Sequence, residues 1–328
     1  MMKEAKKLYN LLEEILSKIP QGEDTGIMLS GGLDSSSIAC LILSKGKKLR
    51  SISASFKGFP MYDETEYVEA IKEKYPQLEV NYFSPIEIDL IEELKKLMKI
   101  IKEPILSGSP LLQYLILRRA KELGMKNLIY CQGPDELMGG YDPFLLAKAK
   151  EDFFHLKISN AIINIIEYIK RSKMVGTDLI LLRAIKVFIT SKDLKTEMKK
   201  SLTNLNHLIS IAQKTANFLG IKLILPYMDP RIIEFCQSLD SDKFIFRGQT
   251  KVILREAVVD VLPEKILKRK VKFGFFAPDS IWLLKNREKI EKINDEIILK
   301  EYKKFLKNPN KRWYKELWIA LSNYCLKK

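Results

Sequence analysis

Apolar residues recur along the chain with two different periods, one typical of helices and the other typical of strands. Over residues 1–19, leucine and isoleucine return every three or four positions, which predicts an amphipathic helix. Short β-branched or alternating runs predict four strands, at 26–29, 49–56, 78–83 and 127–131. Helical patterns follow these strands or lie between them, at 34–44, 63–75, 87–102 and 110–123.

Strands that alternate with helices indicate an α/β fold, in which a parallel twisted sheet has helices on both faces. The rest of the pattern predicts mainly helices, at 143–220, 248–262 and 281–328, with a strand or extended turn at 223–231. We therefore predict two parts. The first is an α/β core at 1–142, and the second is a mainly helical part at 143–328 that completes the functional site.

The composition is typical of a globular protein. Of the 328 residues, 46% are hydrophobic and 30% are charged, which excludes a disordered chain. Charges interrupt each apolar run well before the ~20 residues that a membrane span needs, and the N-terminal segment is not of the signal-peptide type. The four cysteines are scattered and form no CxxC pair, which is typical of reduced packing residues. We expect a cytoplasmic localisation and no membrane partner.

The net charge of +15 allows two interpretations. Lysine stripes could bind nucleic acid, or a solvated lysine-rich surface could surround a cleft that binds phosphates. Lysine, isoleucine and glutamate are abundant and glutamine is sparse, a composition seen in hyperthermophile proteins. This composition favours the second interpretation, so nucleic acid is not the favoured partner.

The most informative motif is a glycine turn between the first strand and the helix after it. An apolar run ends in Ser30-Gly31-Gly32, and a helical pattern begins near Asp34. Glycines allow a tight turn and leave their N–H groups uncovered, while the following helix directs its positive dipole end at the same place. Donors gathered at a helix N-terminus suit a di- or triphosphate.

An aspartate, Asp34, stands near the position at which a Walker loop has its lysine. A carboxylate beside phosphates repels them unless a divalent cation lies between, so we predict that Asp34 is a Mg²⁺ ligand. The alternative is an ordinary glycine turn in which Asp34 and Ser35 only cap a helix.

Further carboxylates follow the fourth strand, at Asp135 and Glu136. Because the carboxyl ends of parallel strands meet at one edge of a sheet, we expect Asp135 to meet Asp34 across one cation. The alternative is that Asp135 and Glu136 only begin a helix.

The C-terminal half contains two basic candidates. Lys251 shares a predicted helix face with Arg255 and Glu256, so it either points into the cleft or belongs to a salt-bridged surface. The basic run at 265–272, followed by the aromatic residues at 273–276, forms either a flap that faces the phosphates or a solvated loop.

Taken together, these motifs resemble the PP-loop ATP pyrophosphatases, and in particular the C-terminal synthetase domain of asparagine synthetase B and its β-lactam and carbapenam synthetase relatives. SGGLDSS is similar to that family's phosphate loop, and GPDELMGGY at 133–141 resembles its G-x-D-E-x-x-G-G-Y motif. LPYMDPRIIEF resembles its VPFLD segment. GQTKVILREAV resembles the segment that holds its catalytic lysine. The ordered motifs run from about residue 8 to 280.

The resemblance implies an ATP-dependent, AMP-forming amidoligase that adenylates a carboxylate, expected to be aspartate, and transfers ammonia or an amine to it. It implies ATP and Mg²⁺ as cofactors, with Lys251 and Glu136 as catalytic residues and Asp34 and Asp135 as metal ligands. The ATP-binding residues that it implies are Leu29, Ser30, Gly31, Gly32, Asp34, Ser35, Ala54, Cys131 and Gly133.

The resemblance covers the synthetase half of that family alone. The family's glutaminase domain begins with a nucleophilic cysteine after the initiator methionine, where this chain has Met2. We therefore expect free ammonium, a separate glutaminase subunit or another amine as the nitrogen source, and a homo-oligomer is compatible with the chain. Gln132 replaces a family glutamate that is thought to serve amine attack, which leaves the substrates open. Two alternative functions remain, a tRNA-modifying adenylating enzyme and a non-catalytic ATP-binding partner subunit.

Overall fold

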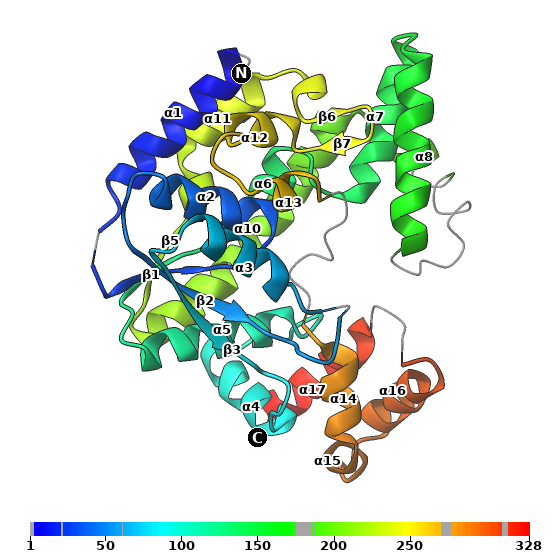
Figure 1. Cartoon of the computed structure of the whole chain (residues 1–328). Helices are drawn as coiled ribbons and strands as arrows, with labels where there is room; N and C mark the ends of the chain where they lie inside the picture. The colour runs from blue at the N-terminus through cyan, green and yellow to red at the C-terminus, as the bar shows by residue number, and fades with distance from the viewer. Residues whose placement is uncertain are drawn as a thin grey trace.

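The computed structural model describes residues 3–20, 22–60, 62–174, 185, 188–269, 277–309 and 314–328. A five-stranded sheet lies at its centre in the order β3-β2-β1-β4-β5 (Figure 1). The strands are β1 (Thr25–Met28), β2 (Leu49–Ala54), β3 (Leu78–Phe83), β4 (Asn127–Ile129) and β5 (Lys222–Ile224). Neighbouring strands in this sheet pair in parallel, which confirms the predicted fold class.

The two faces of the sheet are buried beneath different helices, because successive side chains of a strand point to opposite faces. In β1, Ile27 packs into one apolar cluster and Met28 into another, and Ile129 and Leu128 of β4 divide in the same way. The helices on the first face are α1 (Lys3–Ser17), α2 (Leu33–Leu43) and α3 (Thr65–Lys74). Those on the second are α4 (Leu90–Ile101), α5 (Ser109–Glu122) and the end of α10 (Leu194–Leu219). Helices on both faces are therefore confirmed.

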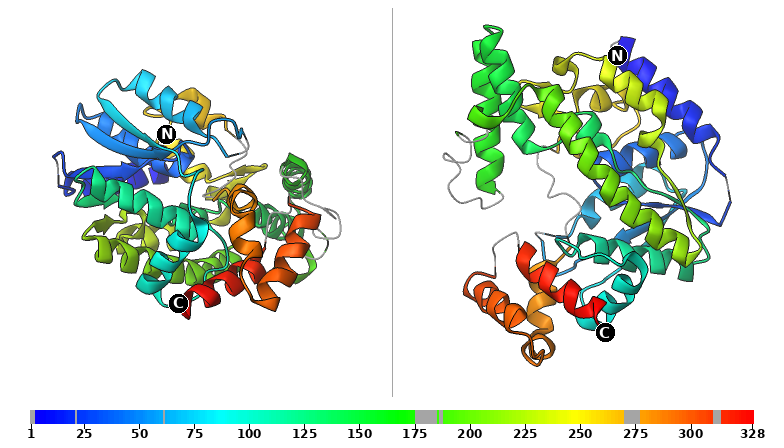
Figure 2. Two further views of the ribbon diagram at one scale, coloured as in Figure 1. Left: turned by 90° about the horizontal axis from the view of Figure 1, so that it is seen from below. Right: turned by 180° about the vertical axis from the view of Figure 1, so that it is seen from behind.

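The second part of the chain is mainly helical in its described residues, as predicted. Helix α10 crosses the back of the molecule, where it contacts α4, α5 and α7 (Figure 2). The other helices whose bounds lie within the described residues before 270 are α6 (Pro134–Leu137), α7 (Asp142–Phe154), α8 (Ile158–Met174), η1 (Pro226–Met228), α11 (Pro230–Ser238), η2 (Ser241–Lys243), α12 (Val252–Ala257) and α13 (Glu264–Leu267). The division at residue 142 stays a prediction, and β5, which lies beyond it, joins the central sheet. None of the described helices combines the length and the apolarity needed to cross a bilayer.

One predicted element is wrong at its start. The pattern predicts a helix from residue 248, but β6 (Ile245–Phe246) and β7 (Gln249–Thr250) form an antiparallel hairpin there, and α12 begins only at Val252. Gly248 and Lys251 have φ angles of 79° and 54°, which a right-handed helix does not allow. The paired strands thus override a helical periodicity that is present in the sequence.

The C-terminal helices pack beside α4 and share its apolar cluster (Figure 1). They are α14 (Asp279–Lys285), α15 (Arg287–Glu291), α16 (Glu296–Lys307) and α17 (Lys315–Leu326). Trp282 and Trp318 are fully buried in this cluster, which confirms the predicted packing role for these two. Trp313 lies outside the described residues.

Asp279 joins these helices to the segment before α5. Its carboxylate accepts hydrogen bonds from the Gly108 N–H at 3.2 Å and from Trp318 Nε1 at 3.0 Å. Burial raises the pKa of Asp279 to about 7, against the effect of these two donors. The folded protein therefore binds this proton more tightly than the unfolded chain does. The free energy of unfolding therefore decreases as the pH rises from 3.8, the usual pKa of an aspartate, to about 7, the pKa of Asp279 in the folded protein.

We expect Asp279→Asn to remove this contribution. Between pH 4.5 and pH 7.5 the wild type should lose roughly 3 kcal/mol more unfolding free energy than the variant does. Urea titrations followed by tryptophan fluorescence measure the difference, and Asp260→Asn, at an exposed position, is the matched control. Equal pH dependence in the wild type and in Asp279→Asn would contradict the prediction.

Candidate active site

The candidate residues meet at the carboxyl edge of the sheet, where the strand order reverses. The chain leaves β1 toward β2 and β3, and then returns to the other side of β1 to form β4. At such a switch point the loops after the two strands diverge and leave a crevice between them. The loop after β1 contains Ser30, Gly31 and Gly32, and the loop after β4 leads to Asp135.

The loop after β1 closes into a compact turn at the start of α2. The Ser30 N–H donates to Ser35 Oγ at 3.2 Å, and the Gly32 N–H donates to Ser30 Oγ at 3.3 Å. Gly32 is the N-cap of α2, and no side chain caps the helix there. These bonds hold the loop in place at the positive end of α2, which is the position expected for phosphates.

Gly31 is required where it stands. Its φ of 71° lies in the left-handed region, and a Cβ would lie 2.8 Å from the Cβ of Tyr67 and 2.9 Å from the carbonyl oxygen of Glu64. The start of α3 thus packs directly on the loop. Arg269 forms an ion pair with Glu64, and its Cζ lies 4.1 Å from the ring centre of Tyr67. The segment after α13 therefore packs on the same two residues that contact the loop.

The centre of the site is an ion cluster of three side chains. Lys251 Nζ donates to both carboxylate oxygens of Asp34, each at 2.7 Å, and lies 2.7 Å from Asp135 Oδ1. Two oxygen atoms that each contact one nitrogen lie within twice that distance of each other, so the structure brings Asp34 and Asp135 together around Lys251 Nζ. The metal ion expected between them stays a prediction. Asp34 and Lys251 are 3% and 4% exposed, so Lys251 does not belong to a salt-bridged surface.

The backbone at Lys251 is adapted to this position. Lys251 is the N-cap residue of α12 and adopts the left-handed conformation, with φ 54° and ψ 39°. For a residue other than glycine this costs on the order of 1 kcal/mol, and such strain is concentrated at functional sites. Gly140 makes the room for the cluster, because a Cβ there would overlap Asp135 Oδ1 and Lys251 Cε.

Glu136 lies beside the cluster and is buried. The Tyr141 hydroxyl donates to its Oε1 at 2.5 Å, and in the described part of the chain its Oε2 has no hydrogen-bond partner. Burial, together with the nearby Asp135 charge, raises the pKa of Glu136 to about 7. Asp135 and Glu136 also lie in the first turn of the short helix α6. The two residues therefore begin a helix, which was the alternative interpretation, and also lie at the candidate site.

The residues expected to contact adenosine lie on three adjacent strands. Ala54 ends β2, Leu29 follows β1, and Cys131 follows β4. The Leu29 N–H donates to the Ile52 carbonyl at 2.9 Å, which fixes the start of the loop. Gly133 has a φ of 118° and is the N-cap residue of α6. These positions share the carboxyl edge of the sheet, and their nucleotide contacts stay predictions.

The basic segment after α12 reaches the same region. Arg255 donates to the carbonyl oxygens of Thr250 at 3.0 Å, Leu267 at 2.6 Å and Arg269 at 3.0 Å, so it connects the hairpin to this segment. Residues 270–276, which contain the end of the predicted flap, lie outside the described residues.

The residues present fit a magnesium–phosphate ligand better than a free metal ion. The described part of the chain holds no group of three or more histidine, cysteine, aspartate or glutamate side chains that could enclose a metal. Mg²⁺ commonly takes one or two carboxylates and completes its shell with water and substrate phosphates. Asp34 and Asp135 could supply two such carboxylates, next to a loop suited to the phosphates.

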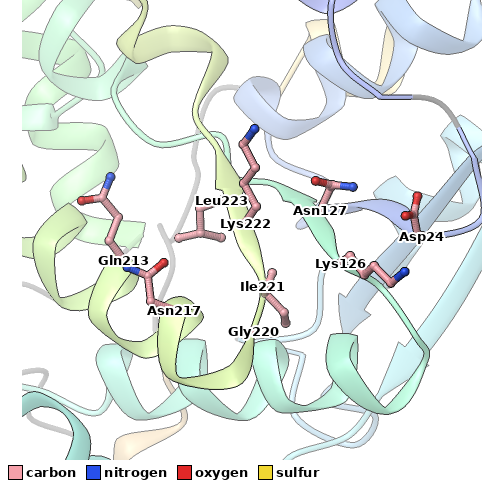
Figure 3. A pocket seen from close by; sticks show the side chains of 9 residues that line it. All are labelled: Asp24, Lys126, Asn127, Gln213, Asn217, Gly220, Ile221, Lys222 and Leu223. Atoms are coloured by element: carbon pink, nitrogen blue, oxygen red, sulfur yellow. The ribbon is translucent and has the colours of Figure 1, made fainter.

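A pocket of about 770 Å³ lies elsewhere, at the amino ends of β4 and β5 (Figure 3). Exposed Lys126 and Lys222 line it, together with Asn217 of α10. Ligands of open parallel sheets bind at the opposite, carboxyl ends of the strands. The pocket also lacks the buried ion cluster, so we place the chemistry at the carboxyl edge.

Sequence reasoning missed several residues around the cluster. The buried Tyr227 hydroxyl donates to the Asp34 carbonyl at 3.0 Å and so fixes the first turn of α2. In the sequence, the only indication that Tyr227 belongs to the site was its position in the LPYMD segment. Arg171 and Asn164 of α8 contact the hairpin before Lys251, in a region where the sequence showed helical periodicity alone.

Comparisons with known proteins show the family to which the chain is similar. A family model described as asparagine synthase matches residues 8–307. The glutamine-hydrolyzing asparagine synthetase of Asparagus officinalis is 28% identical over 159 residues, which cover 44% of this chain and 25% of that protein. A second relative, glutamine-hydrolyzing asparagine synthetase 1 of Bacillus subtilis, is 23% identical over 305 residues, which cover 79% of this chain and 47% of that protein. The chain thus spans about half, or less, of the length of these relatives.

Proposed function

Because the chain belongs to the asparagine synthase family, we propose that it is an ATP-dependent, AMP-forming amidoligase with aspartate as its carboxylate substrate. In the first step the carboxylate attacks the α-phosphorus of ATP, which gives an acyl-adenylate and releases pyrophosphate. In the second step ammonia or an amine attacks the acyl carbon and releases AMP. The observation that supports this proposal most strongly is the convergence of Asp34, Asp135 and Lys251 beside a phosphate-type loop.

The proposed binding of ATP assigns separate tasks to the parts of the site. Ser30, Gly31, Gly32 and Ser35 hold the pyrophosphate end, and the strand ends at Leu29, Ala54 and Cys131 hold adenosine. Asp34 and Asp135 hold Mg²⁺, which when bound shields the phosphate charges from the two carboxylates.

Lys251 supplies charge where the reaction needs it. Negative charge moves toward the pyrophosphate as the bond to the α-phosphorus breaks, and a buried ammonium stabilises it more strongly than it could in water. The 2.7 Å contacts hold Lys251 Nζ between the two carboxylates before ATP binds. Positioning and charge neutralisation therefore provide most of the proposed rate enhancement.

Glu136 is the proposed proton acceptor of the second step. The attacking ammonia or amine carries an extra proton after it bonds to the acyl carbon, and a base must remove it. Gln132 cannot take a proton at neutral pH. Glu136, whose pKa is raised to about 7, can do so, and its Oε2 makes no hydrogen bond within the described residues.

Exchange of labelled pyrophosphate into ATP tests the first step. We expect exchange that requires Mg²⁺ and aspartate, and AMP release that requires added ammonium as well. A screen of other amino acids and small carboxylates identifies the substrate if aspartate fails. ATP binding without exchange for any carboxylate would contradict the proposal and favour a non-catalytic subunit.

The nitrogen source is proposed to be free ammonium or a separate glutaminase subunit. AMP release that ammonium supports but glutamine does not is the expected result for this chain. A second candidate function, adenylation of a tRNA base, rests on the net charge of +15. Retention of tRNA that weakens steeply with salt would support that candidate.

A further inference from the structure

Helix α8 holds the hairpin that leads into Lys251. The turn of this hairpin consists of Arg247 and Gly248. Their φ angles are 46° and 79°, and a two-residue type I′ turn requires a positive φ at both positions. The Gly248 N–H donates to Asn164 Oδ1 at 2.7 Å, and Arg171 Nη2 donates to the Gly248 carbonyl at 2.7 Å. Both backbone polar groups of Gly248 are therefore bonded to α8.

The turn also packs against α8. A Cβ at Gly248 would lie 3.0 Å from the Cβ and Cγ of Glu167, so a larger residue would push the turn away from the helix. The hydroxyl of Thr250, directly before Lys251, accepts from Arg171 Nη1 at 3.5 Å. Strand β7, which leads into Lys251, is thus held against one side of α8.

Arg171 contacts a second segment of the site as well. Its Nη1 lies 3.3 Å from Asp142 Oδ1, and its Nε lies 3.2 Å from Glu167 Oε1. Asp142 begins α7, directly after the glycine turn that follows Asp135. Arg171 is only 4% exposed and Glu167 is 13% exposed, so the bond between them forms largely away from water, whereas the Asp142 side chain is 36% exposed and water screens that contact in part. One guanidinium therefore joins the hairpin that carries Lys251 to the segment that carries Asp135.

We infer that Arg171 is a positioning residue, which fixes the distance between Lys251 and Asp135 by binding Gly248 and Asp142 together. Asn164 supports it by holding the N–H of the same glycine. The kinetic consequence rests on the proposed ligase function, whereas the placement of Lys251 does not. Loss of the guanidinium should release the hairpin and move Lys251 Nζ away from its two carboxylates.

Chemical labelling of lysines tests the placement without an activity assay. Acetic anhydride should acetylate buried Lys251 far more slowly than Lys268, whose side chain is 75% exposed, as peptide mass spectrometry can measure. In Arg171→Met we expect the Lys251 to Lys268 labelling ratio to rise about tenfold, because the buried ammonium becomes accessible. Lys170→Met, at an exposed position one residue earlier in α8, should leave the ratio unchanged. An unchanged ratio in Arg171→Met would overturn the inference.

A second variant guards against misfolding. Arg171→Lys keeps a cation for Asp142 and Glu167 but lacks the planar fork that reaches Gly248, so it should show the same rise in labelling. If it labels Lys251 at the wild-type rate, the guanidinium geometry does not place Lys251.

Kinetics provide an independent readout if the wild type performs the exchange reaction. Arg171→Lys should lower kcat about 10-fold to 100-fold and leave the KM for ATP nearly unchanged, because it acts through Lys251. In a Lys251→Met background the same substitution should cause no further loss, whereas additive losses would indicate a general structural role and overturn the inference. If the wild type shows no exchange, the proposed function fails, and the labelling result still decides the role of Arg171.

Discussion

Lys251→Met is expected to lower the rate of ATP–pyrophosphate exchange by a factor of about 100 or more, equivalent to on the order of 3 kcal/mol of transition-state stabilisation. The substitution removes the ammonium that lies 2.7 Å from both Asp34 and Asp135. Without it, the departing pyrophosphate loses the buried positive charge that the proposed mechanism assigns to Lys251. Initial rates at saturating ATP and aspartate measure the effect.

Lys268→Met is the matched control, because it removes an exposed lysine from the segment after α12 and should leave the exchange rate unchanged. Circular dichroism should show that both variants are folded. A nearly unchanged kcat in a folded Lys251→Met protein would show that this lysine does not act in the chemistry.

Asp34→Ala is expected to destabilise the fold in addition to abolishing exchange. Asp34 is 3% exposed, and its carboxylate compensates the buried charge of Lys251. Removing one partner of a buried ion pair leaves the other charge uncompensated, which typically costs about 3–5 kcal/mol. Urea denaturation at neutral pH measures the loss.

Asp135→Ala separates stability from activity. The Asp135 side chain is 25% exposed, so water can replace part of its contact with Lys251 and the loss of unfolding free energy should be clearly smaller. Exchange should nevertheless fall in both variants, because each removes a proposed magnesium ligand. Equal stability of Asp34→Ala and the wild type would show that the buried cluster does not stabilise the fold.

The local elements of the core could be predicted because their signals are short in range. Period-two alternation and the glycine turn at residues 30–32 require no knowledge of distant segments, and the strands and helices around them appear where the pattern places them. The hairpin before Lys251 could not be predicted in this way. Its two-residue strands are too short to show a period, and their pairing partner and α8 decide their conformation.

The candidate site divides along the same line. Glycines and carboxylates after strand ends were sufficient to identify Asp34 and Asp135, because parallel topology brings strand ends to one edge. The sequence left two interpretations of Lys251, since a lysine on an amphipathic helix is usually solvated. In the structure Lys251 is buried and contacts Asp34, a residue 217 positions earlier in the sequence, which excludes a solvated lysine.

By itself, therefore, the sequence determined the fold class, the phosphate-type loop and the two carboxylates, because periodicity, glycine and strand-end chemistry are local properties of a chain. Only the tertiary structure decided that Lys251 lies between those carboxylates and that Arg171 joins the segments that carry Lys251 and Asp135. Both facts depend on long-range packing of α8, the hairpin and α7. A charged side chain in a helical pattern looks the same in the sequence whether it faces water or a buried partner, and only the folded neighbours distinguish the two.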